Sequence, residues 1–247
     1  MSILVTRPSP AGETLVKRLI EQGMVAYHTP LITFSAGNGL NNLPKYLINL
    51  RQDDIIIAVS QHAVQYAQDF LSHHHLTLPT HIQYFAIGEK TAFELQQAAH
   101  QQVSLPEGRA ISEQLLKLPQ LQHVAGKKVL ILRGNGGRQL LAETLEKRGA
   151  LVTFCECYQR DPIAYDGNDL CHYWQQIHIN TLVITSGEML QQLYQLVPEG
   201  FRHWLFTCRL LVVSERLADQ AKHLGWSQCY IADNANNEAL LRALQQI

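Results

Sequence analysis

The chain has 247 residues, 46% of them hydrophobic, which is enough for one large or two small domains with a real core. Lys and Arg number 20 against 21 Asp and Glu, a formal net charge of −1, and this balance argues against a general nucleic-acid binder. No basic leader precedes a long apolar segment, and no apolar run approaches the roughly 20 residues of a membrane span. We therefore expect a cytoplasmic protein without membrane association.

Six continuous apolar runs are typical of parallel strands that are buried on both faces. In chain order they cover residues 3–6, 55–60, 84–88, 129–132, 182–186 and 210–214. Helical spacing follows them, for example at Leu15 and Leu19 after the first run and at Leu141 and Leu145 after the fourth. This alternation predicts an α/β fold with parallel sheets.

A shift of 126 residues superimposes the elements without a gap. Leu4-Val5-Thr6-Arg7 falls on Leu130-Ile131-Leu132-Arg133, and Ser60 falls on Ser186. Identities are sparse, so the prediction depends on the shared register of strand ends and helix starts. We infer an internal duplication into two similar α/β halves, about 1–121 and 127–247.

Ligands of open parallel sheets bind outside the carboxyl ends of the strands, so those ends define the candidate binding residues. They are mostly small or hydrogen-bonding residues interspersed with arginines: Thr6, Arg7, Ser60, Gln61, Gly88, Arg133, Asn135, Gly136, Arg138, Thr185, Ser186, Ser214 and Arg216. Each end precedes a predicted helix, whose first N–H groups favour anions. We expect an anionic ligand that is large enough to contact both halves.

The most unusual segment is Arg133-Gly134-Asn135-Gly136-Gly137-Arg138, between a strand and a helix. Gln139 stands where a dinucleotide fingerprint needs its third glycine, and no Gly-Lys-Ser/Thr follows as in a P-loop. Glycines allow close backbone approach to a ligand, and arginines bind anions. The alternative is a tight turn with solvated arginines.

Other candidates also carry structural alternatives. Ser60 and Ser186 are good helix N-caps, a role compatible with ligand contact. Tyr158 is either a side chain that projects into a cleft or a half-buried strand aromatic. The run His73-His74-His75 is expected in a solvated loop rather than at a metal. The five cysteines form no CxxC pair, which predicts reduced thiols without a disulfide framework or zinc site.

Taken in order, several segments make the chain resemble the uroporphyrinogen-III synthase family over essentially its full length. They are Ile3-Leu4-Val5-Thr6-Arg7-Pro8, Ser60-Gln61-His62-Ala63-Val64, Phe85-Ala86-Ile87-Gly88, the segment from Leu130 to Arg138, Tyr158-Gln159-Arg160, Thr185-Ser186-Gly187 and Val212-Val213-Ser214-Glu215-Arg216. No segment is diagnostic alone, but their order and spacing are specific.

The resemblance implies two parallel-sheet α/β domains joined by a two-stranded antiparallel ladder, with a cleft between them. One domain would combine 1–34 with 166–247, and the other would cover 46–155. The linking strands would lie near 29–34 and 156–161. The duplication alone would have given two sequential domains.

The resemblance also implies a cyclising hydro-lyase of haem, sirohaem and cobalamin biosynthesis. Its substrate would be hydroxymethylbilane, a linear tetrapyrrole with eight carboxylates, and its product uroporphyrinogen III, with the last ring inverted. Enforcing one conformation is then the main task, and Tyr158 would assist the departing hydroxyl without being essential. We expect no cofactor and no metal, a monomer, and no partner beyond the substrate and a transient contact with the preceding pathway enzyme.

A function of another class also fits the strand ends. A non-catalytic two-domain binder of a phosphorylated or nucleotide ligand would explain the duplicated halves and the anion-ready helix starts. It would leave the full-length family resemblance unexplained.

Overall fold

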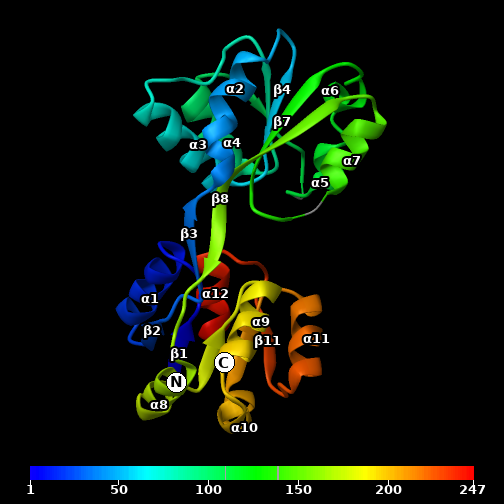
Figure 1. Ribbon diagram of the computed structural model, residues 1–247. Coiled ribbons are helices and arrows are strands. Elements are labelled where there is room, and N and C mark those ends of the chain that lie inside the picture. Colours follow the sequence, from blue (N-terminus) through cyan, green and yellow to red (C-terminus); the bar gives the residue numbers. More distant parts are fainter. Residues whose placement is uncertain (109, 138) are drawn as a thin grey trace. The chain divides into compact units, whose positions relative to one another are not determined.

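The computed structural model describes residues 1–108, 110–137 and 139–247, and the chain forms two compact units (Figure 1). Unit 1 comprises residues 1–33 and 161–247, and unit 2 comprises residues 34–160. The predicted domain bounds, 1–34 with 166–247 and 46–155, stay a prediction. The cleft between the domains also stays a prediction.

Unit 1 contains a parallel sheet with the strand order β11-β10-β9-β1-β2. Its strands are β1 (Ser2–Val5), β2 (Val25–His28), β9 (Thr181–Val183), β10 (Arg209–Val212) and β11 (Cys229–Ile231). Its helices are α1 (Ala11–Glu21), α8 (Gly167–Gln176), α9 (Gly187–Leu196), α10 (Glu199–Thr207), α11 (Glu215–Leu224) and α12 (Asn237–Leu244). The predicted strands at residues 3–6, 182–186 and 210–214 thus all lie in this sheet.

Unit 2 is built around a sheet with the order β3-β8-β7-β4-β5-β6, parallel from β8 to β6. Its strands are β3 (Ile32–Ala36), β4 (Ile55–Ala58), β5 (Gln83–Ala86), β6 (Val103–Ser104), β7 (Lys128–Gly134) and β8 (Leu151–Pro162). The helical segments are η1 (Asn38–Asn42), α2 (Leu43–Ile48), α3 (Gln61–His73), α4 (Glu89–Ala99), α5 (Ser112–Leu115), α6 (Pro119–Gln122) and α7 (Leu140–Lys147).

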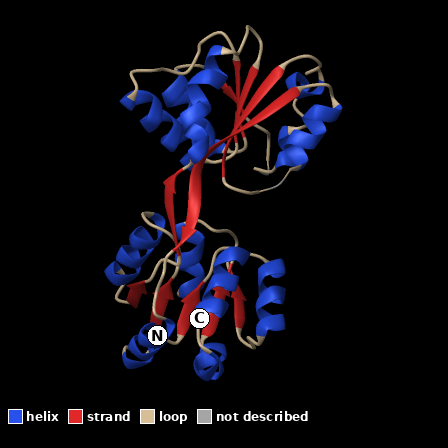
Figure 2. Cartoon of the chain, viewed as in Figure 1, coloured by secondary structure: helices blue, strands red, loops and turns tan. Residues whose placement is uncertain are grey.

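Helices cover both faces of each sheet, which is why the strands read as continuous apolar runs (Figure 2). Successive side chains of a strand point to opposite faces. In β4, Ile56 and Ala58 belong to a core shared with α2, α3 and α4, whereas Ile55 and Ile57 pack in a core with α5, α6 and α7. The predicted α/β class with parallel sheets is confirmed. In the described residues, no helix is both long and apolar enough for a membrane span.

Strands β3 and β8 each contain a boundary between the units and are paired with each other. Ile163 donates a backbone hydrogen bond to Leu31, and Gly37 donates one to Cys157, so residue numbers run in opposite directions along the pair. This is the predicted antiparallel ladder. Glycine is required at position 37, because a Cβ there would lie 2.1 Å from the carbonyl oxygen of Glu156.

The offset of 126 recurs in the described elements. β4 and β9 start at residues 55 and 181, and β5 and β10 start at 83 and 209. The unit 1 sheet therefore takes β1 and β2 from the first half of the sequence and β9, β10 and β11 from the second. The unit 2 sheet takes β3 to β6 from the first half and β7 and β8 from the second. Common ancestry of the halves stays a prediction. The exchange of strands between the halves explains why unit 1 consists of two separate segments and why unit 2 lies between them in the sequence.

Candidate functional site

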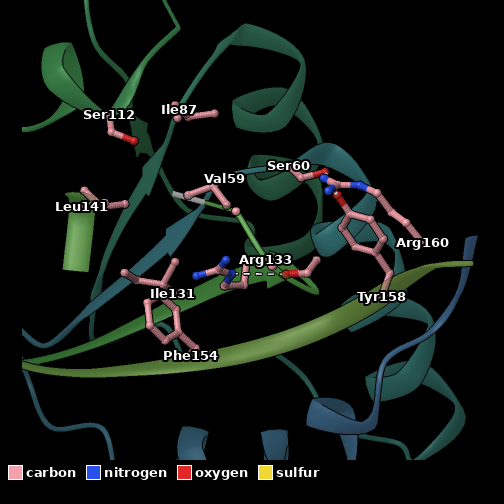
Figure 3. Close-up of a pocket in the computed structure, with 13 residues that line it drawn as sticks. Val59, Ser60, Ile87, Ser112, Ile131, Arg133, Leu141, Phe154, Tyr158 and Arg160 are labelled. Carbon is pink, nitrogen blue, oxygen red and sulfur yellow. Dashed lines mark hydrogen bonds between the residues drawn. The ribbon is translucent and has the colours of Figure 1, made fainter. Parts of the chain in front are cut away.

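A cavity of about 190 Å³ opens at the carboxyl ends of β4, β7 and β8 in unit 2 (Figure 3). Apolar side chains and a few polar groups share its wall: Val59, Ser60, Ile87, Ser112, Ile131, Arg133, Gly134, Gly136, Gly137, Leu141, Phe154, Tyr158 and Arg160. Four predicted site residues, Ser60, Arg133, Gly136 and Tyr158, come together here. An apolar cavity with a few convergent polar groups is typical of a ligand site.

The ring of Tyr158 is packed inside unit 2, with only 2% of the residue exposed. It lies against Phe34, His62 and Tyr66, with ring centroids 5.5, 5.8 and 6.0 Å away. Gly134 on β7 leaves the remaining space, because a Cβ there would lie 2.5 Å from Cζ of the tyrosine. The ring is therefore fixed by its neighbours, and the expectation of a half-buried aromatic is wrong because the residue is fully buried, although it also lines the cavity.

The Tyr158 hydroxyl belongs to a short polar chain. It donates a hydrogen bond to Oγ of Ser60 at 3.2 Å and accepts one from Nη2 of Arg160 at 3.2 Å. Ser60 is also the N-cap of α3, since Oγ accepts from the backbone N–H of His62 at 3.2 Å. The N-cap interpretation of Ser60 is confirmed, and its contact with a ligand stays a prediction. A phenol between a hydroxyl and a guanidinium can pass its proton to a leaving group while the cation offsets the charge that develops.

Asn135 fixes the backbone on both sides of the tyrosine. Its N–H donates to the carbonyl of Tyr158 at 2.9 Å, and its side-chain Oδ1 accepts from the backbone N–H of Arg160 at 2.9 Å. The register between β7 and β8 shifts at Arg133/Gly134, where the β-sheet contains a bulge. The predicted ligand contact at Asn135 therefore has a second interpretation, in which the side chain positions Tyr158 and Arg160.

Arg133 is buried, with 5% of the residue exposed. Its guanidinium carbon lies 4.5 Å from the ring centroid of Phe154, and Nε donates to the carbonyl of Gly134 at 3.2 Å. Among residues 1–108, 110–137 and 139–247, no carboxylate forms an ion pair with it. The alternative of a turn with solvated arginines is wrong for Arg133. Arg138 lies outside the described residues.

Gly88 lies at a second hollow of about 690 Å³, which Ile87 shares with the first. The residue is the N-cap of α4, and a Cβ at this position would come within 2.9 Å of Cβ of Ala110. Gln61, the first residue of α3, is half-buried and lines neither hollow. The carboxyl edge of the unit 2 sheet thus presents two adjoining depressions.

The predicted site residues of unit 1 lie at the matching strand ends. Thr6 is fully buried, and its hydroxyl donates to the carbonyl of Val183 at 2.8 Å, so its side chain ties β1 to β9. Arg7 donates to the side chain of Asn237, and burial lowers the pKa of its guanidinium. Its carbonyl is 2.7 Å from Nε2 of His28.

Serine side chains cap the helices after β9 and β10. Ser186 accepts from the backbone N–H of Met189 at 3.2 Å, and Ser214 accepts from that of Leu217 at 3.3 Å. Thr185 is half-buried beside the first of them. Arg216 is exposed and donates to Gln220 at 3.3 Å. Ser186 and Ser214 are the N-caps of α9 and α11 in unit 1, as Ser60 and Gly88 are the N-caps of α3 and α4 in unit 2.

Sequence reasoning missed Arg160, His62 and Ser112. Arg160 follows Tyr158 by two residues on a strand, and that period places both on one face, so the signal was present. His62 and Tyr66 share one face of α3 at a spacing of four. Burial, together with the charge of Arg160, lowers the pKa of His62, and a hydrogen bond with Gln65 opposes the shift. Ser112 carried no sequence signal.

The histidine run begins at the end of α3 and continues into the turn that follows, and all three side chains are exposed, so the expected solvated position is confirmed except that His73 is still helical. The helix includes His73, whose Nδ1 is 2.7 Å from the carbonyl of Asp69, and Nδ1 of His74 is 2.7 Å from that of Phe70. Within the part of the chain that the structure describes, no group of three His, Cys, Asp or Glu side chains is placed to hold a metal ion.

The fold and the cavity define an α/β protein with two sheet-bearing units, one of which presents a tyrosine and two arginines at its strand ends. The model of the family described as Uroporphyrinogen-III synthase HemD matches residues 13–242. The uroporphyrinogen-III synthase of Escherichia coli (strain K12) is 56% identical over 99% of this chain and 100% of that protein. The corresponding Salmonella typhimurium protein is 54% identical over the same shares. The chain belongs to the uroporphyrinogen-III synthase family.

Two solved structures agree with this fold. A mutant uroporphyrinogen III synthase from the extremely thermophilic bacterium Thermus thermophilus has a TM-score of 0.62 at 17% identity, with all of both chains covered. The uroporphyrinogen-III synthetase of Helicobacter pylori 26695 has a TM-score of 0.62 at 17% identity, over 99% of this chain and 98% of that one. At such identities the similarity concerns the fold alone.

Proposed function

We propose that the chain is a uroporphyrinogen-III synthase, which cyclises hydroxymethylbilane to uroporphyrinogen III with inversion of the last pyrrole ring and loss of water. The observation that carries the proposal is the 56% identity to the Escherichia coli enzyme along 99% of the chain. The substrate is supplied by the preceding enzyme, and the chain acts as a monomer in the cytoplasm.

The reaction requires one bond to break before the ring can close. The C–O bond of the terminal hydroxymethyl group breaks, the oxygen takes up a proton and leaves as water, and the pyrrole nitrogen stabilises the remaining azafulvene cation. The last pyrrole then attacks through its substituted carbon and forms a spiro intermediate. The older bond from the spiro carbon to the methylene bridge of the third ring then breaks and leaves an azafulvene cation on that ring. Its methylene carbon bonds to the free α-carbon of the last pyrrole, and loss of the proton from that carbon gives the ring-inverted product.

Tyr158 supplies the proton to the leaving hydroxyl in this proposal. Its O–H already donates to Ser60, so a ligand hydroxyl at the cavity mouth can replace or share that acceptor. Nη2 of Arg160 donates to the same phenol oxygen and offsets the negative charge that forms when the proton leaves. A positioned proton donor contributes about 10²–10⁴-fold. The azafulvene is resonance-stabilised, so activity without this donor is lower but not zero.

The ligand's carboxylates are bound by strand-end groups. In unit 2 these are Ser60, Gln61, Gly88, Arg133 and Gly136, and in unit 1 they are Arg7, Thr185, Ser186, Ser214 and Arg216. Helix starts suit carboxylates, because unpaired N–H groups and the positive end of the helix dipole coincide there. Thr6 supports the sheet instead, and Asn135 positions Tyr158. Arg138, which follows the glycine-rich segment in the sequence, is a further carboxylate-binding group in this proposal.

Conformational control selects the isomer in this proposal. The bilane closes without inversion when left alone, so the enzyme's contribution is to hold the last ring where its substituted carbon is the nearest nucleophile. The strand-end groups favour this function over nucleophilic catalysis, because they are donors for many carboxylates rather than a nucleophile with its base.

A coupled assay tests the proposal. Hydroxymethylbilane is supplied to the purified chain, and the cyclic products are oxidised and separated by isomer. We expect the inverted type III isomer at a rate well above spontaneous closure. Only the type I isomer at the uncatalysed rate would refute the proposal and leave the non-catalytic anion binder as the better account.

A further inference from the structure

We propose that the unit 2 cavity is a subsite for a single carboxylate arm of the ligand, and that the buried guanidinium of Arg133 is its counter-charge. The identity of the whole ligand rests on the proposed function. The proposed function names Arg133 only as one of several carboxylate-binding groups, whereas the size of the arm and its place at this guanidinium are inferred from the cavity.

The charge on Arg133 lacks an anion within the described structure. Only 5% of the residue is exposed, so water reaches it only from the side of the cavity that it lines. Its contacts are one hydrogen bond from Nε to a backbone carbonyl and the face of Phe154. A guanidinium carries five N–H donors in a fork that matches a carboxylate. A buried cation without a counter-ion is costly, and a ligand anion at the free donors would remove that cost.

The shape of the cavity argues for an arm rather than a whole ligand. Its volume is about 190 Å³, below the roughly 300–1,000 Å³ of pockets that bury drug-sized molecules. At about 30 Å³ per water it corresponds to about six waters, close to the size of one acetate or propionate group. The tetrapyrrole itself must therefore remain outside.

The walls favour a carboxylate on a short alkyl stem over a phosphate. Ile87, Ile131, Leu141 and Phe154 present apolar surface beside the single buried cation. Methylene groups gain from such contact, whereas inorganic phosphate has no alkyl stem to place against these walls and would set some of its oxygens beside apolar side chains. Figure 3 shows Arg133 beside Ile131 and Phe154, apart from Ser60, Tyr158 and Arg160.

Gly137 leaves room for the guanidinium of Arg133. Its φ is +105°, and a Cβ there would lie 3.0 Å from Nη2 of Arg133. The glycine-rich turn thus leaves room for the arginine side chain as well as for a ligand. An arm bound here lies in the same cavity as the Tyr158 hydroxyl, so the subsite positions one pyrrole ring relative to the proton donor.

Small probes test the chemistry without the substrate. The amide signals of Gly136 and Gly137 in the full chain are followed by NMR during titration with sodium propionate, propionamide or inorganic phosphate. We expect saturable shifts with propionate and at least tenfold weaker binding of the other two. Equal effects of propionate and propionamide, or stronger binding of phosphate, would overturn the proposal.

Variants locate the effect at Arg133. Arg133→Met removes the charge at similar length and should abolish the propionate shifts. Arg242→Met, which removes an exposed arginine of α12, should leave them unchanged. If Arg133→Met does not fold, Arg133→Lys keeps a cation without the fork and should weaken propionate binding at least threefold. Wild-type affinity for propionate in folded Arg133→Met or folded Arg133→Lys would contradict the assignment.

Kinetics separates this subsite from the proposed function. Arg133→Met should raise KM for hydroxymethylbilane about tenfold and leave kcat within about threefold, because the proton donor is intact. An unchanged KM in the folded variant would show that Arg133 is structural only. If the wild type forms no type III isomer, the proposed function fails, and the propionate titration still decides the subsite.

Discussion

Gly134→Ala should displace the ring of Tyr158 while the tyrosine itself remains in the chain. Gly134 has no positive φ, so alanine is compatible with the backbone, and the whole effect is steric. The added Cβ would lie 2.5, 2.7 and 2.9 Å from Cζ, Cε2 and Cε1 of the tyrosine ring. Carbon atoms pack at about 3.5 Å or more, so the ring has to retreat by about 1 Å.

The neighbours of Tyr158 set the cost of that retreat. Phe34, His62 and Tyr66 surround the ring and have to move with it. Overpacking of this kind costs about 1–3 kcal/mol, and in a chain of this length each kcal/mol lowers Tm by about 2–4 °C. The 3.2 Å bond to Ser60 does not survive such a shift. We expect a rate as low as that of Tyr158→Phe, or lower.

A double-mutant cycle tests this reasoning. In a Tyr158→Ala background the ring is absent, so Gly134→Ala should cost close to nothing in free energy of unfolding. Gly200→Ala is a matched control on α10, where a Cβ meets nothing within 4 Å, and it should stabilise by a few tenths of a kcal/mol to about 1 kcal/mol. Equal destabilisation with and without the Tyr158 ring would refute the steric explanation.

Three further predictions concern pH, thiols and assembly. The pKa of His62 is lowered below its ordinary 6.5, mainly by burial, so its contribution to stability is present above pH 6.5 and is lost as the pH falls through the folded-state pKa. In urea unfolding, the difference in free energy of unfolding between wild type and His62→Gln should therefore be largest above pH 6.5 and shrink below it. A difference that does not change with pH would contradict this. Cys229 is the one cysteine of the five that is not buried, and burial raises the pKa of Cys171 to about 11 and of Cys208 to about 12. Iodoacetamide at pH 8 should therefore alkylate Cys229 first, as followed by mass spectrometry. Earlier labelling of another cysteine would contradict this. Light scattering should give a mass near 27.9 kDa, and a value near twice that would exclude a monomer.

The strands could be predicted from the sequence because burial on both faces leaves a continuous apolar signal. The runs at residues 55–60 and 210–214 begin within one residue of β4 and β10. The exchange of strands between the two halves could not be derived in this way, since sequential and exchanged domains have the same local pattern. Only the family resemblance indicated the discontinuous arrangement.

The site was predicted less completely, for a physical reason. Tyr158 and Arg133 were identified from their position at strand ends, but a strand end does not reveal whether a side chain turns into its own unit or outward. Here both turn inward, because Gly134 makes room for one ring and Gly137 for the guanidinium. Those roles of glycine depend on the neighbouring strand, which the local sequence does not specify.

The most direct test of the account measures rate and isomer composition together for Tyr158→Phe. The variant keeps the ring and its packing and removes only the hydroxyl that donates to Ser60. Hydroxymethylbilane is supplied to wild type and variant side by side, with folding checked by circular dichroism. If proton donation assists while bound conformation selects the isomer, kcat falls by up to about 10²–10⁴-fold and the remaining product is still type III. Complete loss of activity in a folded variant, or a switch to type I, would contradict this division of roles.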